Sequence, residues 1–446
     1  MRVIGISEGY HDAGLSVLEG DRIIFASHAE RYSKTKGDRW LHHDQWSSGH
    51  SNRKTDIIAY YEKPFRKNLR RWYAGQRWQK PKTDYNVSFS HHESHAAAGY
   101  YTSPFNNCNI LVIDAIGEWD TISIWEGNDN KLKKITSWKY PHSLGLFYSA
   151  ITDRIGLKPN EDEYITMGMS AFGEPKYDLE DQFWRNNHKG CEGIFPNALP
   201  EDLAASAQSL YEKELLKLVG MCPHENLVIM GGCALNCVAN SKIKRKNIWI
   251  MPSPGDAGSS LGAAALVNKK KLKWVDPYLG HDILVGVDPK KVVNELLERR
   301  VCGVAHGKAE FGPRALGNRS LLGDPRYDIK DTVNTIKRRQ KFRPFAPAIL
   351  EEYKDEYFEG PMNEYMQFVA KAKHDYSSVT HVDGTARVQV VKKDCQSILR
   401  PILEEWYDRT SCPMLLNTSL NIKGKPIVND WNDACEFERQ YHVAVF

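Results

Sequence analysis

An internal repeat near the beginning of the chain constrains the fold more than any other feature of the sequence. The stretch Leu15-Ser-Val-Leu-Glu-Gly-Asp21 returns as Ile122-Ser-Ile-Trp-Glu-Gly-Asn128. Each copy follows a short apolar segment, at residues 3–6 or 110–113, and a polar turn that contains glycine. Each copy also ends in Glu-Gly-Asp or Glu-Gly-Asn, which suits the positive φ of a hairpin turn. The repeat predicts a duplicated α/β core, with chance similarity between two hairpins as the alternative.

Apolar periodicity and end signals locate the remaining elements. They predict helices at residues 91–101, 143–155, 202–219, 257–267 and 401–408, and strands at residues 226–230, 301–305, 386–391 and 414–417. A run of lysines followed by Asp276-Pro277 interrupts the pattern between residues 268 and 280. We therefore expect two α/β domains, at residues 1–275 and 276–446.

Composition excludes several classes of protein. The 446 residues are 41% hydrophobic and 26% charged, as in ordinary globular chains, and no apolar run approaches the ~18 residues of a membrane span. The first residues turn polar at Ser7, so no signal peptide is expected. The net charge of 60 − 56 = +4 is too small to indicate nucleic acid by itself. The nine scattered cysteines fit reduced thiols, so we expect a cytoplasmic protein without membrane partners.

A histidine pair gives the sharpest chemical signal. In His91-His-Glu-Ser-His95, the first and last histidines lie on one face of a helix and can bind one metal ion. The zincin motif is excluded because Ala96 stands where its second histidine would be. Carboxylates at strand ends, Asp114 and Asp256, are the best further ligands, and such a set suits Fe(II), Mn(II) or Zn(II) better than Mg(II). The alternative is a polar helix start with exposed histidines.

Two further turns of the first domain carry candidate residues. His11, beside Asp12, is either a general base or a turn residue, and the pattern does not separate the two. Gly231-Gly232 follows a predicted strand and opens a predicted helix that contains Asn236 and Asn240. Such a turn suits phosphate or ribose, although many strand–helix turns need glycine only for packing. The chain has no Walker A motif.

Basic residues mark two other segments. In the second domain, Arg and Lys side chains with polar companions suit a small polyanion such as a triphosphate, and surface charge is the alternative; they are Lys308, Arg314, Arg319, Lys341, Arg343, Arg387, Asn417 and Ser419. Residues 66–82 hold seven basic residues and no acid, interleaved with Trp72, Tyr73 and Trp78. This pattern is typical of an amphipathic helix with a solvated basic face, or of a nucleotide-binding or single-strand-binding surface, and we favour the helix.

Taken together, these motifs resemble the NodU/CmcH-type O-carbamoyltransferases nearly from end to end. The landmarks are Tyr10-His-Asp, His91-His-Glu-Ser-His-Ala, Asp114-Ala-Ile-Gly-Glu-Trp, His142-Ser-Leu-Gly-Leu-Phe-Tyr-Ser, Gly231-Gly-Cys-Ala-Leu-Asn-Cys, Glu310-Phe-Gly-Pro-Arg-Ala-Leu-Gly-Asn-Arg-Ser, Phe342-Arg-Pro-Phe-Ala-Pro and Leu416-Asn-Thr-Ser-Leu-Asn. The resemblance implies an actin/hexokinase-like (ASKHA) first domain, related to threonylcarbamoyl transferases, and a YrdC-like second domain. In the second domain carbamoyl phosphate and Mg-ATP would form carbamoyl-adenylate, and in the first an acceptor hydroxyl would take the carbamoyl group.

The resemblance also assigns roles to the candidate residues. It implies that His91, His95, Asp114 and Asp256 bind a metal, which is iron in this family, and that His11 assists the attacking hydroxyl. It implies that Gly231, Gly232, Asn236 and Asn240 bind the adenylate. The activation site would be lined by Arg314, Arg319, Lys341, Arg343, Arg387, Asn417 and Ser419, with Lys308 as a further binding residue.

Three departures from the family pattern concern the metal site, the nucleotide and the acceptor. Ala115 replaces a usual glycine, and Ile165-Thr166 stand where a lysine usually precedes Met-Gly. The segments between residues 31 and 53 and between 175 and 226 are short for the family, which predicts an open acceptor pocket. An open pocket beside the basic and aromatic residues 66–82 would suit a phosphorylated acceptor, such as a hydroxymethylated nucleotide or nucleic-acid base, with a small sugar or secondary metabolite as the alternative.

Other functions are compatible with parts of the sequence. A threonylcarbamoyl-type tRNA modifier, a sugar kinase of the same fold and a nucleic-acid-binding module built on residues 66–82 are the rival hypotheses. The last leaves the histidine–aspartate set unexplained. We expect a monomer or a homodimer.

Overall fold

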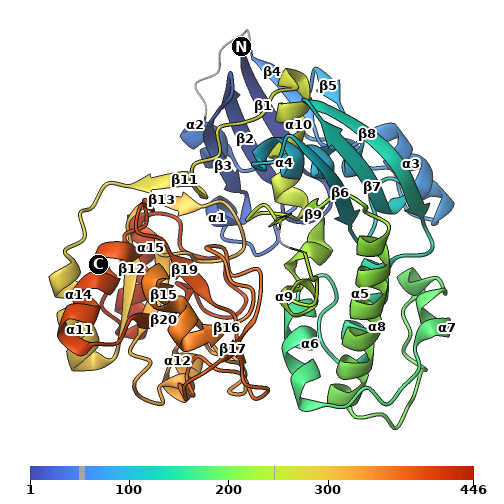
Figure 1. Cartoon of the computed structure of the whole chain (residues 1–446). Coiled ribbons are helices and arrows are strands. Elements are labelled where there is room, and N and C mark those ends of the chain that lie inside the picture. The colour runs from blue at the N-terminus through green and yellow to red at the C-terminus, as the bar shows by residue number, and fades with distance from the viewer. Residues whose placement is uncertain (50–55, 246) are drawn as a thin grey trace. The chain divides into compact units, whose positions relative to one another are not determined.

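The computed structural model describes residues 1–49, 56–245 and 247–446, which form two compact units (Figure 1). The N-terminal unit comprises Met1–Ala29 and Gly37–Trp274, and the C-terminal unit comprises Glu30–Lys36 and Val275–Phe446. The division after Trp274 lies one residue before the predicted boundary. The prediction did not assign Glu30–Lys36, which contains the short helix α1 (Glu30–Ser33), to the C-terminal unit.

Two five-stranded sheets of the same topology form the N-terminal unit. One has the order β3 (Arg22–His28), β2 (Gly14–Glu19), β1 (Arg2–Ser7), β4 (Ile57–Tyr60), β5 (Val87–Ser88). The other has the order β8 (Lys131–Lys139), β7 (Asp120–Asn128), β6 (Asn107–Ile113), β9 (Asn226–Met230), β10 (Asn247–Trp249). In each sheet an antiparallel meander is extended by two parallel strands. The repeated segments lie on β2 and β7, the equivalent strands, so the duplicated actin/hexokinase-like core is confirmed.

The prediction of matching hairpin turns was right for the first copy and wrong for the second. Gly20 has φ 62°, as the turn between β2 and β3 requires. Gly127 instead lies within β7, and the turn is made by Asp129 (φ 44°) and Asn130 (φ 69°). A side chain at Gly127 would lie 2.4 Å from the ring of Tyr100. The second glycine is therefore required by packing and not by the turn.

Equivalent helices follow the two sheets and cross at small residues. Helix α4 (His91–Thr102) follows β5, and α10 (Asp256–Asn268) follows β10. A Cβ atom on Gly262 of α10 would lie 1.8 Å from the carbonyl oxygen of Ser94 on α4, and one on Gly5 of β1 would lie 1.8 Å from that of Ser260. Both contacts require glycine: the first allows α10 to approach α4 closely, and the second allows β1 to approach α10.

Two other helices of this unit, α5 (Leu144–Arg154) and α8 (Pro200–Gly220), agree with the predicted helices at residues 143–155 and 202–219. The remaining helices are α2 (His43–Gly49), α3 (Pro64–Tyr73), α6 (Glu163–Met169), α7 (Glu180–Phe183) and α9 (Cys237–Asn240). Helix α5 begins where Ser143 accepts a hydrogen bond from the amide of Leu146. The long helix α8 packs along α5 (Figure 1).

The C-terminal unit is built on a mixed five-stranded sheet. Its order is β12 (Val301–Ala305), β14 (Arg319–Gly323), β20 (Met414–Ser419), β15 (Ala346–Leu350), β19 (Gln389–Val391). Smaller sheets are formed by β11 (Tyr278–Ile283) with β13 (Gly307–Glu310), and by β16 (Phe358–Glu359), β17 (Ala370–Ala372) and β18 (Thr385–Ala386). The predicted strand at residues 386–391 is thus wrong in part, because β18 and β19 belong to different sheets.

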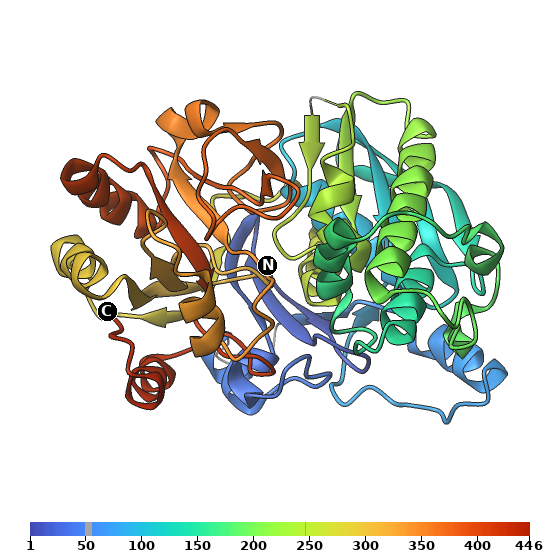
Figure 2. The same ribbon diagram turned by 90° about the horizontal axis from the view of Figure 1, so that it is seen from below.

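Helices of the C-terminal unit cover the sheet and complete its core. They are α11 (Pro289–Arg299), α12 (Lys330–Ile336), α13 (Lys354–Tyr357), α14 (Leu399–Thr410) and α15 (Trp431–Tyr441). Helices α11 and α14 lie side by side (Figures 1 and 2), and the fully buried Trp406 of α14 packs in a core with Val292 and Leu296 of α11. The unit is α/β as expected, and its YrdC-like identity stays a prediction.

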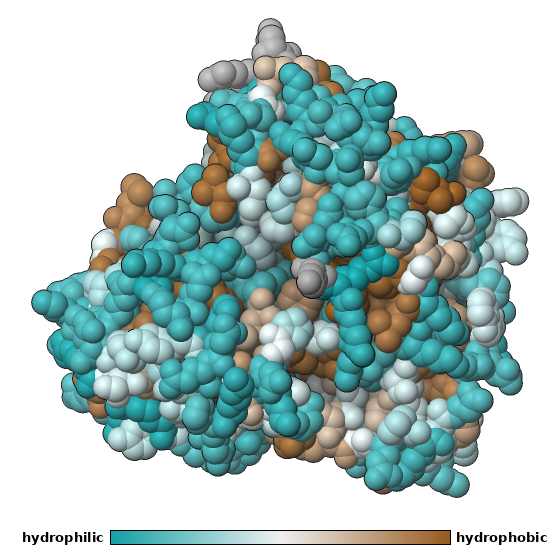
Figure 3. Space-filling view, in the orientation of Figure 1, coloured by the Kyte–Doolittle hydropathy of each residue, from teal (hydrophilic) through white to brown (hydrophobic). Residues whose placement is uncertain are grey.

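The face of the molecule drawn in Figure 3 is mainly polar. Hydrophilic side chains cover most of the face drawn in Figure 3, and hydrophobic side chains occur there in small separate groups. Among the helices of the described residues, none is long and apolar enough to cross a membrane.

Candidate active sites in the two units

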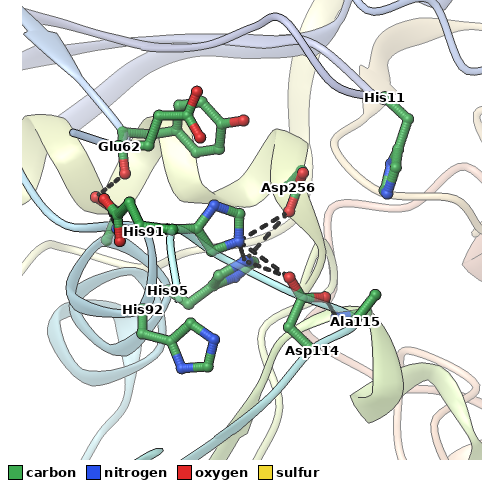
Figure 4. A network of polar contacts seen from close by, with 12 residues as sticks. His11, Glu62, His91, His92, His95, Asp114, Ala115 and Asp256 are labelled. Atoms are coloured by element: carbon green, nitrogen blue, oxygen red, sulfur yellow. Dashed lines mark hydrogen bonds and ion pairs between the residues drawn. The ribbon is translucent and has the colours of Figure 1, made fainter. Parts of the chain in front are cut away.

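Four buried side chains meet in the N-terminal unit. The Nε2 atom of His91 lies 3.0 Å from Asp114 Oδ2 and 3.4 Å from Asp256 Oδ1. The Nε2 atom of His95 lies 3.3 Å from Asp256 Oδ1 and 3.1 Å from His91 Nε2 (Figure 4). All four candidate ligand atoms lie within 4.8 Å of one another. We call these residues the His/Asp cluster. The alternative of exposed histidines is wrong, because His91 is 2% and His95 0% exposed.

The fold of the chain accounts for this convergence. His91 and His95 occupy the first turns of α4, which starts with a capping box between Ser90 and Glu93. Asp114 directly follows the buried strand β6, and Asp256 is the first residue of α10. Gly262 allows α10 to approach α4 closely, so the histidines at the start of α4 lie near Asp256 at the start of α10. Glu118 fixes the start of α4 by accepting a hydrogen bond from the amide of His91 at 3.1 Å.

The electrostatics of the cluster favour a positive charge within it. Burial alone would lower the pKa of His91, but Asp256 and the hydrogen bond with Asp114 raise it to about 9. Burial would raise the pKa of Asp114, but His91 and the other histidines keep it well below its ordinary range. Without a metal the two carboxylates therefore stabilise an imidazolium.

The geometry fits a divalent transition metal. Imidazole nitrogens and carboxylate oxygens lie about 2.0–2.2 Å from such an ion, so ligands of one ion are roughly 3–4 Å apart. The closest contacts of the cluster, 3.0–3.9 Å, agree with this spacing. The Oδ2 atom of Asp256 is buried and has no hydrogen-bond partner among the described residues, which an ion would also provide. Nothing in the donor set selects iron over manganese or zinc.

His11 lies beside the cluster, on the side of the two aspartates (Figure 4). Its side chain is 32% exposed, and its Nδ1 atom lies 3.0 Å from Asp12 Oδ2. Burial by itself lowers the pKa of His11, but the hydrogen bond with Asp12 and the charges of Asp256, Asp12 and Asp114 raise it to about 10. Without a metal, His11 is therefore protonated at neutral pH and cannot accept a proton there.

The glycine pair supports a ligand of the cluster. The amide of Gly232 donates to Asp114 Oδ1 at 3.2 Å, which leaves Oδ2 facing the histidines. Gly231 has φ 92°, and a Cβ atom there would lie 2.1 Å from the carbonyl oxygen of Ile113. Gly231 thus needs glycine for its conformation, and a Cβ atom on Gly232 would make a tight contact of 3.3 Å with Asp114 Oδ1.

The predicted helix after the glycine pair needs a correction. The chain forms a 3-10 turn (Gly232–Leu235) and then only the four residues of α9. Asn236 caps α9 and exchanges hydrogen bonds with Gln208, and Asn240 donates to the carbonyl of Ala234 at 2.8 Å. These asparagines fix the turn, so their assignment to the adenylate stays a prediction that the geometry does not support.

In the C-terminal unit, strand ends bring several predicted residues to one edge of the sheet. Ser419 at the end of β20 pairs with Ser320 at the start of β14. Ala346 at the start of β15 pairs with Asn417, and β19 runs parallel to β15. Arg343 and Arg387, which precede β15 and β19, therefore enter the sheet from the same edge as Asn417 and Ser419.

The motif from Glu310 to Arg319 is a loop fixed by one buried carboxylate. Glu310 Oε1 accepts hydrogen bonds from the amides of Leu316 (2.7 Å), Asn318 (2.9 Å) and Arg319 (3.3 Å). Asn417 reaches the same loop through the carbonyl of Ala315 at 3.3 Å. Phe311, Ala315 and Leu316 are buried within this loop, whereas Pro313 is exposed and Arg314 is half-buried. The apolar residues of the motif thus serve to anchor the loop, and Arg314 stands at its partly exposed part.

Three predicted binding residues of this unit are either committed to internal contacts or exposed. The guanidinium of Arg319 is fully buried, and its five N–H groups donate to the carbonyls of Asn429, His306, Asn318, His281 and Gly307. It has no donor left for a phosphate, so its predicted binding role is corrected to a structural one. Lys341 is 73% exposed and pairs with Asp331 at 3.4 Å, and Lys308 is exposed on β13.

Sequence reasoning missed other cations near the same edge. Lys337 is buried and donates to the carbonyl and hydroxyl oxygens of Ser419 and to Asn421. Burial and the nearby charges of Arg339, Arg343 and Lys36 keep its pKa well below the ordinary value. Arg31 of α1 is also buried and donates to the carbonyl of Gly312. Lys36 and Arg31 lie far away in sequence, and no local pattern marks them.

Both units of the chain match models of one protein family. Residues 293–446 match the family model "Carbamoyltransferase C-terminus", and residues 52–192 and 188–265 match "Carbamoyltransferase N-terminus". The uncharacterized protein sll1178 of Synechocystis is 32% identical over 97% of this chain and 93% of its own length. The nodulation protein NolO of Bradyrhizobium diazoefficiens is 31% identical over 77% of this chain and 75% of its own.

The chain belongs to the carbamoyltransferase family. It is an enzyme of that class, as the motifs predicted. Among solved structures, HypF of T. kodakarensis matches 60% of this chain and 47% of its own, with a TM-score of 0.36 and 11% identity.

The departures of this carbamoyltransferase from the family pattern cause no visible strain. Ala115 has no positive φ, so a residue other than glycine is tolerated there, and its carbonyl accepts a hydrogen bond from Ser143 at 2.6 Å. Ile165 is 1% exposed and Thr166 bonds Thr152 at 2.8 Å, so the missing lysine is replaced by internal packing. The shortened segment between residues 31 and 53 lies partly outside the described residues.

Proposed function

We propose that this carbamoyltransferase activates carbamoyl phosphate with ATP and then transfers the carbamoyl group to an alcohol. Carbamoyl phosphate and water give carbamate and phosphate. A carbamate oxygen then attacks the α-phosphorus of ATP, which forms carbamoyl-adenylate and releases pyrophosphate. The acceptor oxygen attacks the carbamoyl carbon, AMP leaves and the hydroxyl proton is lost.

The observation that carries this proposal is the His/Asp cluster beside His11 in a chain of this family. A divalent ion bound there would act as a Lewis acid toward a carbonyl or phosphoryl oxygen. The four side chains supply its ligands, and Gly232 fixes the orientation of Asp114. His11 is the candidate base for the acceptor hydroxyl, because a cation at the cluster would offset the charges of Asp114 and Asp256 that keep it protonated.

The cationic edge of the C-terminal sheet supports the activation step. Carbamoyl phosphate and ATP are both polyanions, so their reaction needs positive charge nearby. The side chains that act on the pKa of Lys337 are Arg339, Arg343 and Lys36, and all three are basic. Such a concentration of cations is stabilised by a bound polyanion, and this edge is our candidate for the binding site of the two donors.

Pyrophosphate release tests the activation step. The purified protein, Mg-ATP and a divalent metal are incubated without acceptor, with either carbamoyl phosphate or bicarbonate plus threonine. We expect release only with carbamoyl phosphate, and we expect Arg343→Gln to slow it by about 100-fold. Lys291→Met, on the exposed side of α11, is the control and retains the rate. Release with bicarbonate and threonine would instead identify a threonylcarbamoyl-type enzyme.

A further inference from the structure

Helix α3 and the segment after it pack against the turn that carries His11. The carbonyl of Gly9 accepts hydrogen bonds from Lys67 Nζ (3.4 Å) and from Gln79 Nε2 (2.8 Å). Glu8 Oε1 accepts from the amides of Lys82 (2.7 Å) and Thr83 (2.9 Å). Residues 66–82 are therefore not one helix with a solvated face, as the sequence favoured. They instead bind Gly9 and Glu8, which shortly precede His11.

Two basic residues of α3 are buried, and only one has a partner. Lys67 forms an ion pair with the buried Glu62 at 2.6 Å. Arg70 is 8% exposed and forms no ion pair or side-chain hydrogen bond with any described residue, and its Nε atom is both buried and unpartnered. A buried cation without a partner is costly, and native proteins seldom retain one without a function.

The surroundings of Arg70 point toward the His/Asp cluster. The groups that act on its charge are Tyr10, Glu62, Arg71 and Tyr140, of which Glu62 is already paired. Burial raises the pKa of Tyr10 to about 12, Asp256 and Asp114 add to this shift, and Arg70 opposes it. The Tyr10 side chain is thus within electrostatic reach of both the cluster and Arg70. An anion bound to Arg70 would therefore lie next to the turn that carries His11, the candidate base for the acceptor hydroxyl.

We propose that Arg70 binds a phosphate ester on the hydroxyl-bearing acceptor, and that the acceptor is a nucleotide. This inference rests on the proposed function. The planar guanidinium presents paired N–H donors that match phosphate oxygens. Two exposed cations that follow α3, Arg77 and Lys80, favour a group with more than one negative charge. Trp72 and Trp78 are 69% and 56% exposed and offer stacking surfaces for a base.

The test compares matched alcohols with matched variants. The probes are a hydroxymethylated pyrimidine nucleoside, its monophosphate, and a short single strand that contains it, and binding is measured by calorimetry on the full metal-loaded chain. We expect the phosphate to tighten binding by about 10-fold or more in the wild type. Arg70→Met should remove this preference, Arg70→Lys should restore part of it, and Arg66→Met, an exposed control on the same helix, should retain it.

A structural role for Arg70 would give different results. If Arg70 only supported the fold, Arg70→Met would lower the Tm and leave the phosphate preference unchanged, which would overturn the proposal. We expect an equal or higher Tm, because the substitution removes an unpaired buried charge. Equal binding of nucleoside and monophosphate by the wild type would also overturn it. Tighter binding of the monophosphate than of the strand identifies a free nucleotide as the source of the phosphate, and the reverse identifies nucleic acid. Pyrophosphate release without acceptor reports separately on the proposed function.

Discussion

Metal binding at the His/Asp cluster should stabilise the N-terminal unit, and His95 should be required for it. His95 is completely buried and lies within 3.3 Å of both His91 and Asp256. His92 is a matched control on the same helix. It is also buried, but its Nδ1 atom lies 2.7 Å from Ser123 Oγ, outside the cluster. His95→Ala and His92→Ala thus each remove one buried imidazole, and only His95→Ala removes a proposed metal ligand.

The size of the effect follows from linkage. A ligand that binds only the folded state at 100 times its Kd stabilises that state by about 2.7 kcal/mol. For a unit of this size, each kcal/mol raises the Tm by roughly 2–4 °C, so the expected shift is roughly 5–10 °C. Both substitutions should lower the metal-free stability through a cavity and lost polar contacts. The metal-dependent shift should persist in His92→Ala and disappear in His95→Ala.

Thermal unfolding with and without Mn(II), Zn(II) or anaerobic Fe(II), together with elemental analysis of the purified protein, measures this effect. The metal that gives the largest shift identifies the preferred ion. The reasoning is refuted if no metal shifts the wild-type Tm, or if His92→Ala and His95→Ala lose the shift equally.

Three further predictions concern other residues. Glu310→Ala should destabilise the C-terminal unit by about 3 kcal/mol or more in denaturant unfolding, because three buried amides lose their acceptor; an unchanged midpoint would contradict this. Arg319→Met should destabilise that unit similarly, since five carbonyls lose a donor, and Arg314→Met should leave unfolding nearly unchanged. In the metal-free protein, His11 should titrate near pH 10 by NMR. Because this value exceeds the unfolded value of about 6.5, its contribution to stability is fully present below pH ~6.5 and is lost as the pH rises through about 10. Metal should lower this pKa, and a titration near pH 6.5 without metal would disprove the assignment.

The parts of the fold and site that could be predicted depend on local spacing. His91 and His95 share a helix face whatever the rest of the chain does, and Asp114 stands at the end of an obviously buried strand. The repeat at Leu15 and Ile122 lies on equivalent strands because the same alternation fits the same position in each sheet. These features needed no knowledge of distant contacts.

The parts that could not be predicted depend on tertiary partners. Gly127 looks like a turn residue until the ring of Tyr100 is placed against it. Arg319 looks like an anion ligand, and only the folded unit shows the carbonyls that occupy all its donors. Lys67 and Arg70 belong to the same basic segment, but Glu62 pairs with one and no described residue pairs with the other. Charge patterns locate cations, and burial and partners decide their roles.

The fate of ATP tests the central claim most directly. Carbon-labelled carbamoyl phosphate, ATP, metal and a hydroxymethylated pyrimidine monophosphate are incubated with the enzyme, and the nucleotide products are separated by chromatography. The proposed mechanism predicts one AMP and one pyrophosphate for each labelled carbamate ester formed. Formation of ADP, with phosphate on the acceptor and the label left in carbamoyl phosphate, would show a kinase and contradict the account.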